Sequence, residues 1–99
     1  MSGAVKHDHG KLRLDLITPE MTRGLGEVLT FGAGKYADRN WEKGLDSGRL
    51  LAACQRHLLA HQEGEVTDPE SGLSHLAHAM CNLGMLLTLE QRRNAGAAQ

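Results

Sequence analysis

The sequence predicts a small all-α domain of about three helices, with a C-terminal helical hairpin and an extended N-terminal arm. Apolar residues recur at helical spacing in three segments, and each segment follows a residue that can cap a helix. The chain has 99 residues and is only 3% aromatic, so leucine, alanine and methionine must supply most of the core. Because a domain of this size buries little apolar surface by itself, we expect a homo-oligomer.

The first helix is predicted from Pro19 to the low thirties. Thr18 offers a side-chain cap, and Pro19 suits the first helical position because its missing N–H costs nothing there. Before this helix, residues 11–16 alternate leucines with charged residues, which fits a short strand or, as we favour, an extended arm packing one edge against the helices. Residues 1–10 are polar and are expected to form a flexible segment.

The second and third helices are predicted to form the hairpin. The second begins at Asp46 or Ser47 and stops at Gly64. Asp68-Pro69-Glu70 resembles the start of the first helix and predicts that the third helix begins there. Its apolar stripe would contain Leu73, Leu76, Met80, Leu83 and Leu87. Residues 11–90 would therefore form one helical domain, followed by a flexible tail at residues 91–99.

Composition and charge argue against several classes of protein. With 11 basic and 12 acidic residues, the chain lacks the basic excess of a broad interface for a nucleic-acid polymer. No apolar run approaches the roughly 20 residues of a membrane span, and no secretory signal opens the sequence. We expect a cytoplasmic protein without a membrane partner. Cys54 and Cys81 are accordingly expected to be reduced core thiols.

Four of the six histidines form two helical pairs, His57/His61 and His75/His78. Residues three or four apart share a helix face, so a hairpin would bring the four imidazoles together near its closed end. This spacing suits a zinc ion or another first-row metal ion, with oxygen ligands from the intervening acids suiting magnesium or manganese. The alternative is phosphate binding by protonated histidines and Arg56 without a metal. The acids of the turn are Glu65, Asp68 and Glu70, and Asn82 shares the histidine face of the third helix.

A second group of polar residues follows the first predicted helix, between Phe31 and Gly44. Its glycines allow close backbone approach, its cations can bind phosphate, and its aromatic rings can stack on a base. It is not a Walker loop, because the required spacing and the following Ser or Thr are absent. A helix end with a core tryptophan fits equally well. The candidate ligand-binding residues are Lys35, Tyr36, Arg39, Asn40 and Trp41, with Lys11 and Arg13 reaching in from the arm.

Four stretches of the chain together carry a resemblance to a known family. They are residues 11–17, 31–44, 56–57 and 68–82, within a region of roughly residues 10–89. They resemble a family of small phage and prophage proteins, the dATP/dGTP diphosphohydrolase N-terminal domain. The resemblance implies a helical protein that hydrolyses a purine deoxynucleoside triphosphate to monophosphate and diphosphate with a divalent cation. It also implies that the acids Glu65, Asp68 and Glu70 and the imidazoles of His57, His75 and His78 surround the metal or the phosphates.

Two functions from different classes follow, so the sequence leaves open whether the chain is an enzyme. The first is a metal-dependent nucleotide diphosphohydrolase, in which Mg²⁺, Mn²⁺ or Zn²⁺ activates water. The second is a binding protein that sequesters a nucleotide, or a cyclic nucleotide immune signal, without cleaving it. The histidine and acid cluster favours the first, whereas the absence of the carboxylate runs of MazG-type pyrophosphohydrolases favours the second. A structural helical module without a ligand is the third alternative.

Overall fold

The computed structural model describes residues 5, 7 and 9–97, and in this part of the chain the architecture is all-α, as predicted. Three α-helices follow one another: α1 (Pro19–Lys35), α2 (Ser47–Gln62) and α3 (His75–Ala97). Two short 3-10 helices, η1 (Leu14–Leu16) and η2 (Asn40–Lys43), lie before and after α1. The flexible segment predicted for residues 1–10 falls largely outside the described residues.

Local hydrogen bonds explain where α1 and α2 begin and end. The Thr18 hydroxyl oxygen accepts from the Met21 N–H at 3.2 Å, and the Asp46 carboxylate accepts from the Gly48 N–H at 3.0 Å, so both predicted caps are confirmed. Helix α2 ends just before Gly64, whose φ of +102° lies in the left-handed region that favours glycine.

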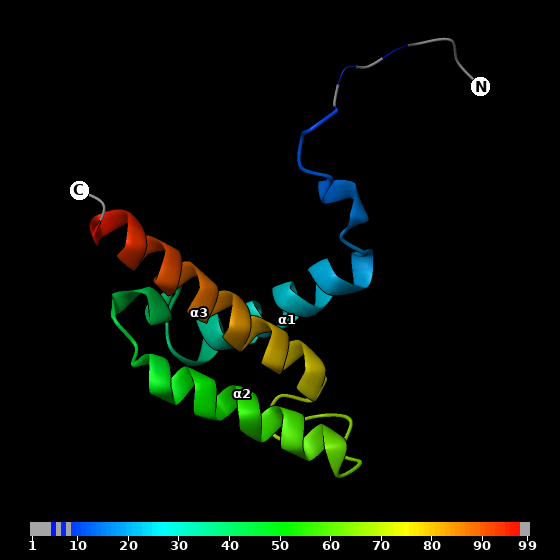
Figure 1. Ribbon diagram of the computed structural model, residues 1–99. Coiled ribbons are helices and arrows are strands. Elements are labelled where there is room, and N and C mark those ends of the chain that lie inside the picture. The colour runs from blue at the N-terminus through cyan, green and yellow to red at the C-terminus, as the bar shows by residue number, and fades with distance from the viewer. Residues whose placement is uncertain (1–4, 6, 8, 98–99) are drawn as a thin grey trace.

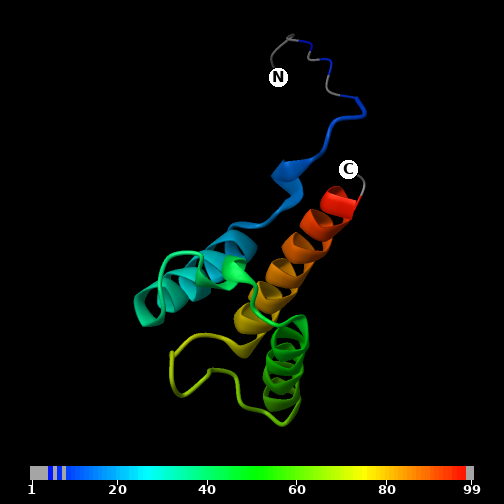
Figure 2. The ribbon, with the colours of Figure 1, turned by 90° about the vertical axis from the view of Figure 1, so that its left-hand side faces the viewer.

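Helix α3 lies at the centre of the fold, with α1 and α2 packed against it (Figure 1). Helices α2 and α3 form the predicted antiparallel hairpin, and the loop of residues 63–74 bulges from its closed end (Figure 2). Helix α1 approaches α3 closely at Gly24, where a Cβ atom would lie 3.3 Å from Met80 Cε and 3.4 Å from Ala77 Cβ.

The core is built mainly from small residues, not from the predicted leucine stripes. The buried apolar residues are Val28, Leu50, Cys54, Ala79 and Cys81, which confirms that both cysteines lie in the core, and neither forms a disulfide. Their reduced state in the cell stays a prediction. Leu76, Leu83 and Leu87, predicted to line the core side of the third helix, are instead about half exposed. Small side chains on α3 permit close helix packing, so the buried face is rotated away from these leucines. The homo-oligomer stays a prediction, which such exposed leucines favour.

The N-terminal arm exists, but it does not pack as expected. It projects away from the helical body (Figure 1), and Leu12 and Leu14 are 87% and 66% exposed. Its backbone forms the 3-10 turn η1 in place of a strand or a fully extended chain. None of the described helices is both long enough and apolar enough to span a bilayer.

Candidate functional site

The site is organised by the loop of residues 63–74, where the structure differs from the sequence prediction. The third helix begins at His75 and not at Asp68. Asp68 Oδ1 accepts hydrogen bonds from the Glu70 and Ser71 N–H groups at 2.7 and 3.2 Å, which resembles a helix cap. The turn then stops at Gly72, whose φ is +72°, and the Ser74 hydroxyl caps α3 by accepting from the Leu76 N–H at 3.1 Å. Asp68 is thereby held at a fixed place beside the helices.

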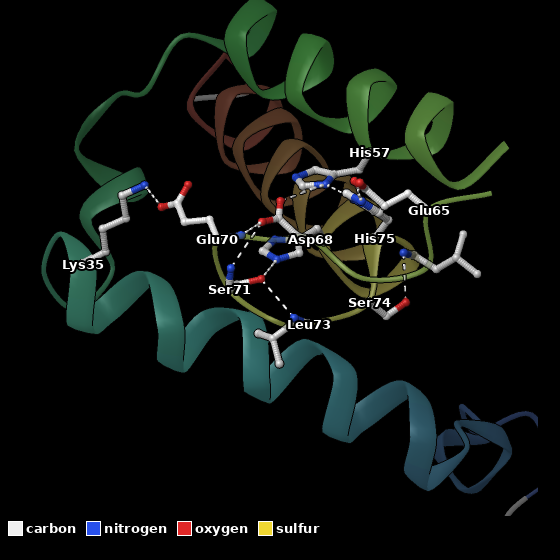
Figure 3. A network of polar contacts seen from close by, with 11 residues as sticks. Lys35, His57, Glu65, Asp68, Glu70, Ser71, Leu73, Ser74 and His75 are labelled. Carbon is white, nitrogen blue, oxygen red and sulfur yellow. Dashed lines mark hydrogen bonds and ion pairs between the residues drawn. The ribbon is translucent and has the colours of Figure 1, made fainter. Parts of the chain in front are cut away.

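Three side chains form a continuous polar chain next to this turn. His75 Nε2 lies 2.7 Å from Glu65 Oε1, and His75 Nδ1 lies 2.9 Å from His57 Nδ1 (Figure 3). A carboxylate accepts but does not donate, so the proton of neutral His75 resides on Nε2. The Nδ1 lone pair of His75 consequently faces His57, although His75 itself is only 4% exposed. This lone pair can accept the His57 Nδ1–H or bind a cation.

His78 lies on the other side of His57. Its ring stacks on the His57 ring with centroids 4.5 Å apart and planes inclined by 8°, and Phe31 meets it edge-on at 6.4 Å. His78 Nε2 lies 2.7 Å from the Ser71 hydroxyl oxygen, which also accepts from the Leu73 N–H at 3.1 Å. The Ser71 hydroxyl has one donor and two acceptor lone pairs, so it can donate to His78 Nε2 or accept from it, according to the tautomer of His78, while it accepts from Leu73. The loop therefore fixes this imidazole as well.

The donor atoms of His57, Asp68 and His75 fit a metal ion. One donor atom from each lies within 4.8 Å of the other two, and His57 Nδ1 is 3.8 Å from Asp68 Oδ2. The Glu65 contact behind His75 is the carboxylate–histidine arrangement that typically orients a metal-ligating imidazole. Two imidazoles and one carboxylate suit zinc or manganese better than magnesium, which prefers oxygen ligands.

The electrostatics of this centre favour the forms of the side chains that bind a cation. Burial lowers the pKa of the His57 and His78 imidazoles, because the charged ring is poorly solvated there, and the neighbouring His78 adds to the effect at His57. Burial raises the pKa of Asp68, but the backbone hydrogen bonds from Glu70 and Ser71, together with the nearby His78 and His57, outweigh it and hold that pKa below its usual value. Near neutral pH, neutral imidazoles therefore face an ionised Asp68.

This centre opens onto a cleft of about 1090 Å³ between the three helices and η2. Most of the residues predicted from the sequence meet here. The predicted site residues that line the cleft are Lys35, Tyr36, Arg39, Asn40, Trp41, His57, Asp68, Glu70, His78 and Asn82. The two polar groups of the sequence, far apart along the chain, thus line one cavity.

Other predicted site residues lie apart from the cleft. Lys11 and Arg13 belong to the projecting arm, and Arg13 pairs with Asp15 at 2.8 Å. Arg56 is exposed and is not among the residues that line the cleft, and His61 is exposed beyond His57. Glu65 acts behind His75 and does not line the cavity.

Several residues of the cleft and its centre were not predicted from the sequence. Ser71, which orients His78, gave no recognisable pattern. Arg49 lines the cleft with Ala53 and His57. Arg49 lies four residues before Ala53 and eight residues before His57, which places all three on the same face of α2, so helical periodicity could have identified Arg49. Glu42 and Arg92 line the cleft as an ion pair at 3.0 Å, a long-range contact with no local signal.

Comparisons with known proteins identify the family of the chain. A family described as "dATP/dGTP diphosphohydrolase, N-terminal" matches residues 2–99. The chain is also 40% identical over 89 residues to a protein of Salmonella phage PMBT28 named dATP/dGTP diphosphohydrolase. The match covers 90% of this chain but only 30% of the relative, so the chain spans less than a third of that protein's length. No solved structure matches the chain significantly. Because the family matches nearly the whole chain and the phage relative is 40% identical over 89 residues, the chain belongs to the dATP/dGTP diphosphohydrolase N-terminal family.

Proposed function

We propose that the cleft binds a purine deoxynucleoside triphosphate and that the chain hydrolyses it to a monophosphate and diphosphate. The observation that carries the proposal is the juxtaposition of the His57, Asp68 and His75 donors with a cleft that contains cations and Trp41. The phage relative's name, dATP/dGTP diphosphohydrolase, supports the choice of substrate and reaction.

His57, Asp68 and His75 would hold a divalent cation. When bound, this ion would supply charge neutralisation at the reacting phosphate and acidify a water molecule. In the overall reaction, the water oxygen forms a bond to the α-phosphorus, the bond between that phosphorus and the bridging oxygen to the β-phosphorus breaks, and diphosphate leaves. The protein would position the phosphate and shield it from bulk water.

The side chains around the centre have distinct roles in this proposal. Glu70, paired with Lys35 across the cleft, is the carboxylate best placed to accept a proton from water once the substrate phosphates take over Lys35. Trp41 is half-buried, lines the same cleft and offers a flat surface to the base. Glu65 keeps His75 in the tautomer that presents Nδ1.

A second function rests on the same cleft. The His57, Asp68 and His75 set contains a single carboxylate, which is few for the magnesium sites that usually process nucleotides. A protein that sequesters a nucleotide, or a cyclic nucleotide, without cleaving it would use the same cations and aromatic rings. The two functions differ in whether the captured ligand is recovered intact.

The test is to incubate the purified chain with dATP, dGTP and cyclic dinucleotides, each with Mn²⁺, Zn²⁺, Mg²⁺ or EDTA, and to separate the products by ion-exchange chromatography. We expect monophosphate and diphosphate with Mn²⁺ or Zn²⁺, and loss of about a hundredfold or more in rate for His75→Ala. His61→Ala should retain activity, since His61 is exposed away from the cleft. Intact ligand released only on denaturation would instead establish sequestration. If the chain neither cleaves nor binds any of these nucleotides, both functions are refuted.

A further inference from the structure

Most cations that line the cleft are already neutralised by carboxylates of the chain. Lys35 pairs with Glu70, while Arg39 and Arg92 share Glu42 at 3.5 and 3.0 Å. Each of these three cations must give up or share a carboxylate before it can bind a phosphate fully. Arg49 differs, because its side chain makes no ion pair or hydrogen bond within the described part of the chain.

The position of Arg49 relates it directly to the histidine centre. Arg49, Ala53 and His57 line the cleft from one face of α2. Eight residues at about 1.5 Å per residue place the Arg49 backbone about 12 Å from that of His57 along the helix axis. Both side chains line the same cleft, which therefore connects the two positions. A phosphate chain that has its reacting phosphate beside His57 can therefore extend along α2 toward the guanidinium.

The chemistry of the guanidinium matches the terminal phosphates of this ligand. Its planar set of N–H donors binds phosphate oxygens in a bidentate manner, and such charge-assisted hydrogen bonds are stronger than neutral ones. A cation without an internal partner also binds an incoming anion without first breaking an ion pair.

We propose that Arg49 binds the terminal phosphates of the nucleotide, so that the cleft selects a triphosphate over the monophosphate product. The inference rests on the proposed function for the position of the reacting phosphate. It adds the residue that distinguishes substrate from product and allows the monophosphate to leave. A monophosphate beside His57 would not extend far enough along α2 to contact Arg49.

The test compares equilibrium binding of α,β-methylene dATP, which cannot be cleaved at the reacting bond, with binding of dAMP, both with Mn²⁺. Calorimetric titrations would use the wild-type chain, Arg49→Gln and Arg49→Lys. Arg23→Gln is the matched control, since Arg23 is an exposed helical arginine outside the cleft. Circular dichroism would verify that each variant is folded.

We expect Arg49→Gln to weaken binding of the triphosphate analogue about tenfold or more and to leave dAMP binding within about twofold of wild type. Arg49→Lys should retain part of the affinity, and Arg23→Gln all of it. Equal losses for both nucleotides, or no loss for either, would overturn the role of Arg49, as would a wild-type chain that binds neither. A chain that binds the analogue through Arg49 but does not cleave dATP would overturn the hydrolase proposal alone.

Discussion

Replacing Glu65 by alanine tests whether the buried histidine is oriented for metal binding. His75 is 4% exposed, and its Nε2–H donates to Glu65 Oε1 at 2.7 Å. Removing the acceptor leaves a buried donor that must rotate or find water, which typically costs about 1–3 kcal/mol. The Glu65 side chain is 51% exposed, so solvent screens its charge and we take the lower part of that range, about 1–2 kcal/mol.

That cost appears in metal affinity, because the free ring loses the orientation that presents Nδ1 toward His57 and Asp68. A loss of about 1–2 kcal/mol corresponds to a dissociation constant raised roughly 5–30-fold. Calorimetric titration with Zn²⁺ and Mn²⁺ would measure it for the wild type, Glu65→Ala and the control Glu63→Ala, whose carboxylate is exposed two residues away. If Glu65→Ala and Glu63→Ala bind the ions as tightly as the wild type does, Glu65 does not support a metal ligand and our reasoning is refuted.

Two further predictions concern stability. Gly24→Leu should destabilise the fold by about 1–3 kcal/mol, because the added atoms collide with Met80 and Ala77 where α1 meets α3. Gly26→Leu is the control and should not destabilise the fold, since no atom lies within 4 Å of its Cβ position. Urea unfolding measures both variants, and equal unfolding midpoints would contradict the α1/α3 packing. The lowered pKa values of His57 and His78 mean that the unfolded chain binds more protons, so the stability they contribute is present above the unfolded-state pKa of about 6.5 and is lost as the pH falls below it. Thermal melts in EDTA should therefore show Tm falling with pH through this window, and a His57→Gln/His78→Gln variant with the same slope would exclude these imidazoles as the cause.

Helix capping was predictable because it depends on neighbouring residues. Thr18 and Asp46 accept hydrogen bonds from the first turns of α1 and α2, and Gly64 ends α2, just as these residue types indicate. The same local chemistry was misleading at Asp68, whose carboxylate caps a single turn. Only the path of the loop back to α3 shows that this turn does not continue into a helix. Helix α3 also extends to Ala97, through residues predicted as a flexible tail, whose flexibility stays a prediction.

The buried faces of the helices were less predictable than the helices themselves. Periodicity indicated Leu76, Leu83 and Leu87 as core, whereas Ala79 and Cys81 are buried. A helix with apolar residues on more than one side can pack in several rotations, and the partner helices decide between them. Here small residues face inward and allow close packing.

The sequence alone determined the helical class, the starts of the first two helices and the pool of histidines, acids and cations from which a site could be built. The tertiary structure decided which of them meet. It placed His57, His75 and His78 together and His61 outside, moved Lys11 and Arg13 away with the arm, and added Arg49 to the cleft. The reason is physical: caps and spacing act within a few residues, whereas the membership of a site depends on how helices rotate and cross, which is fixed by packing between distant segments.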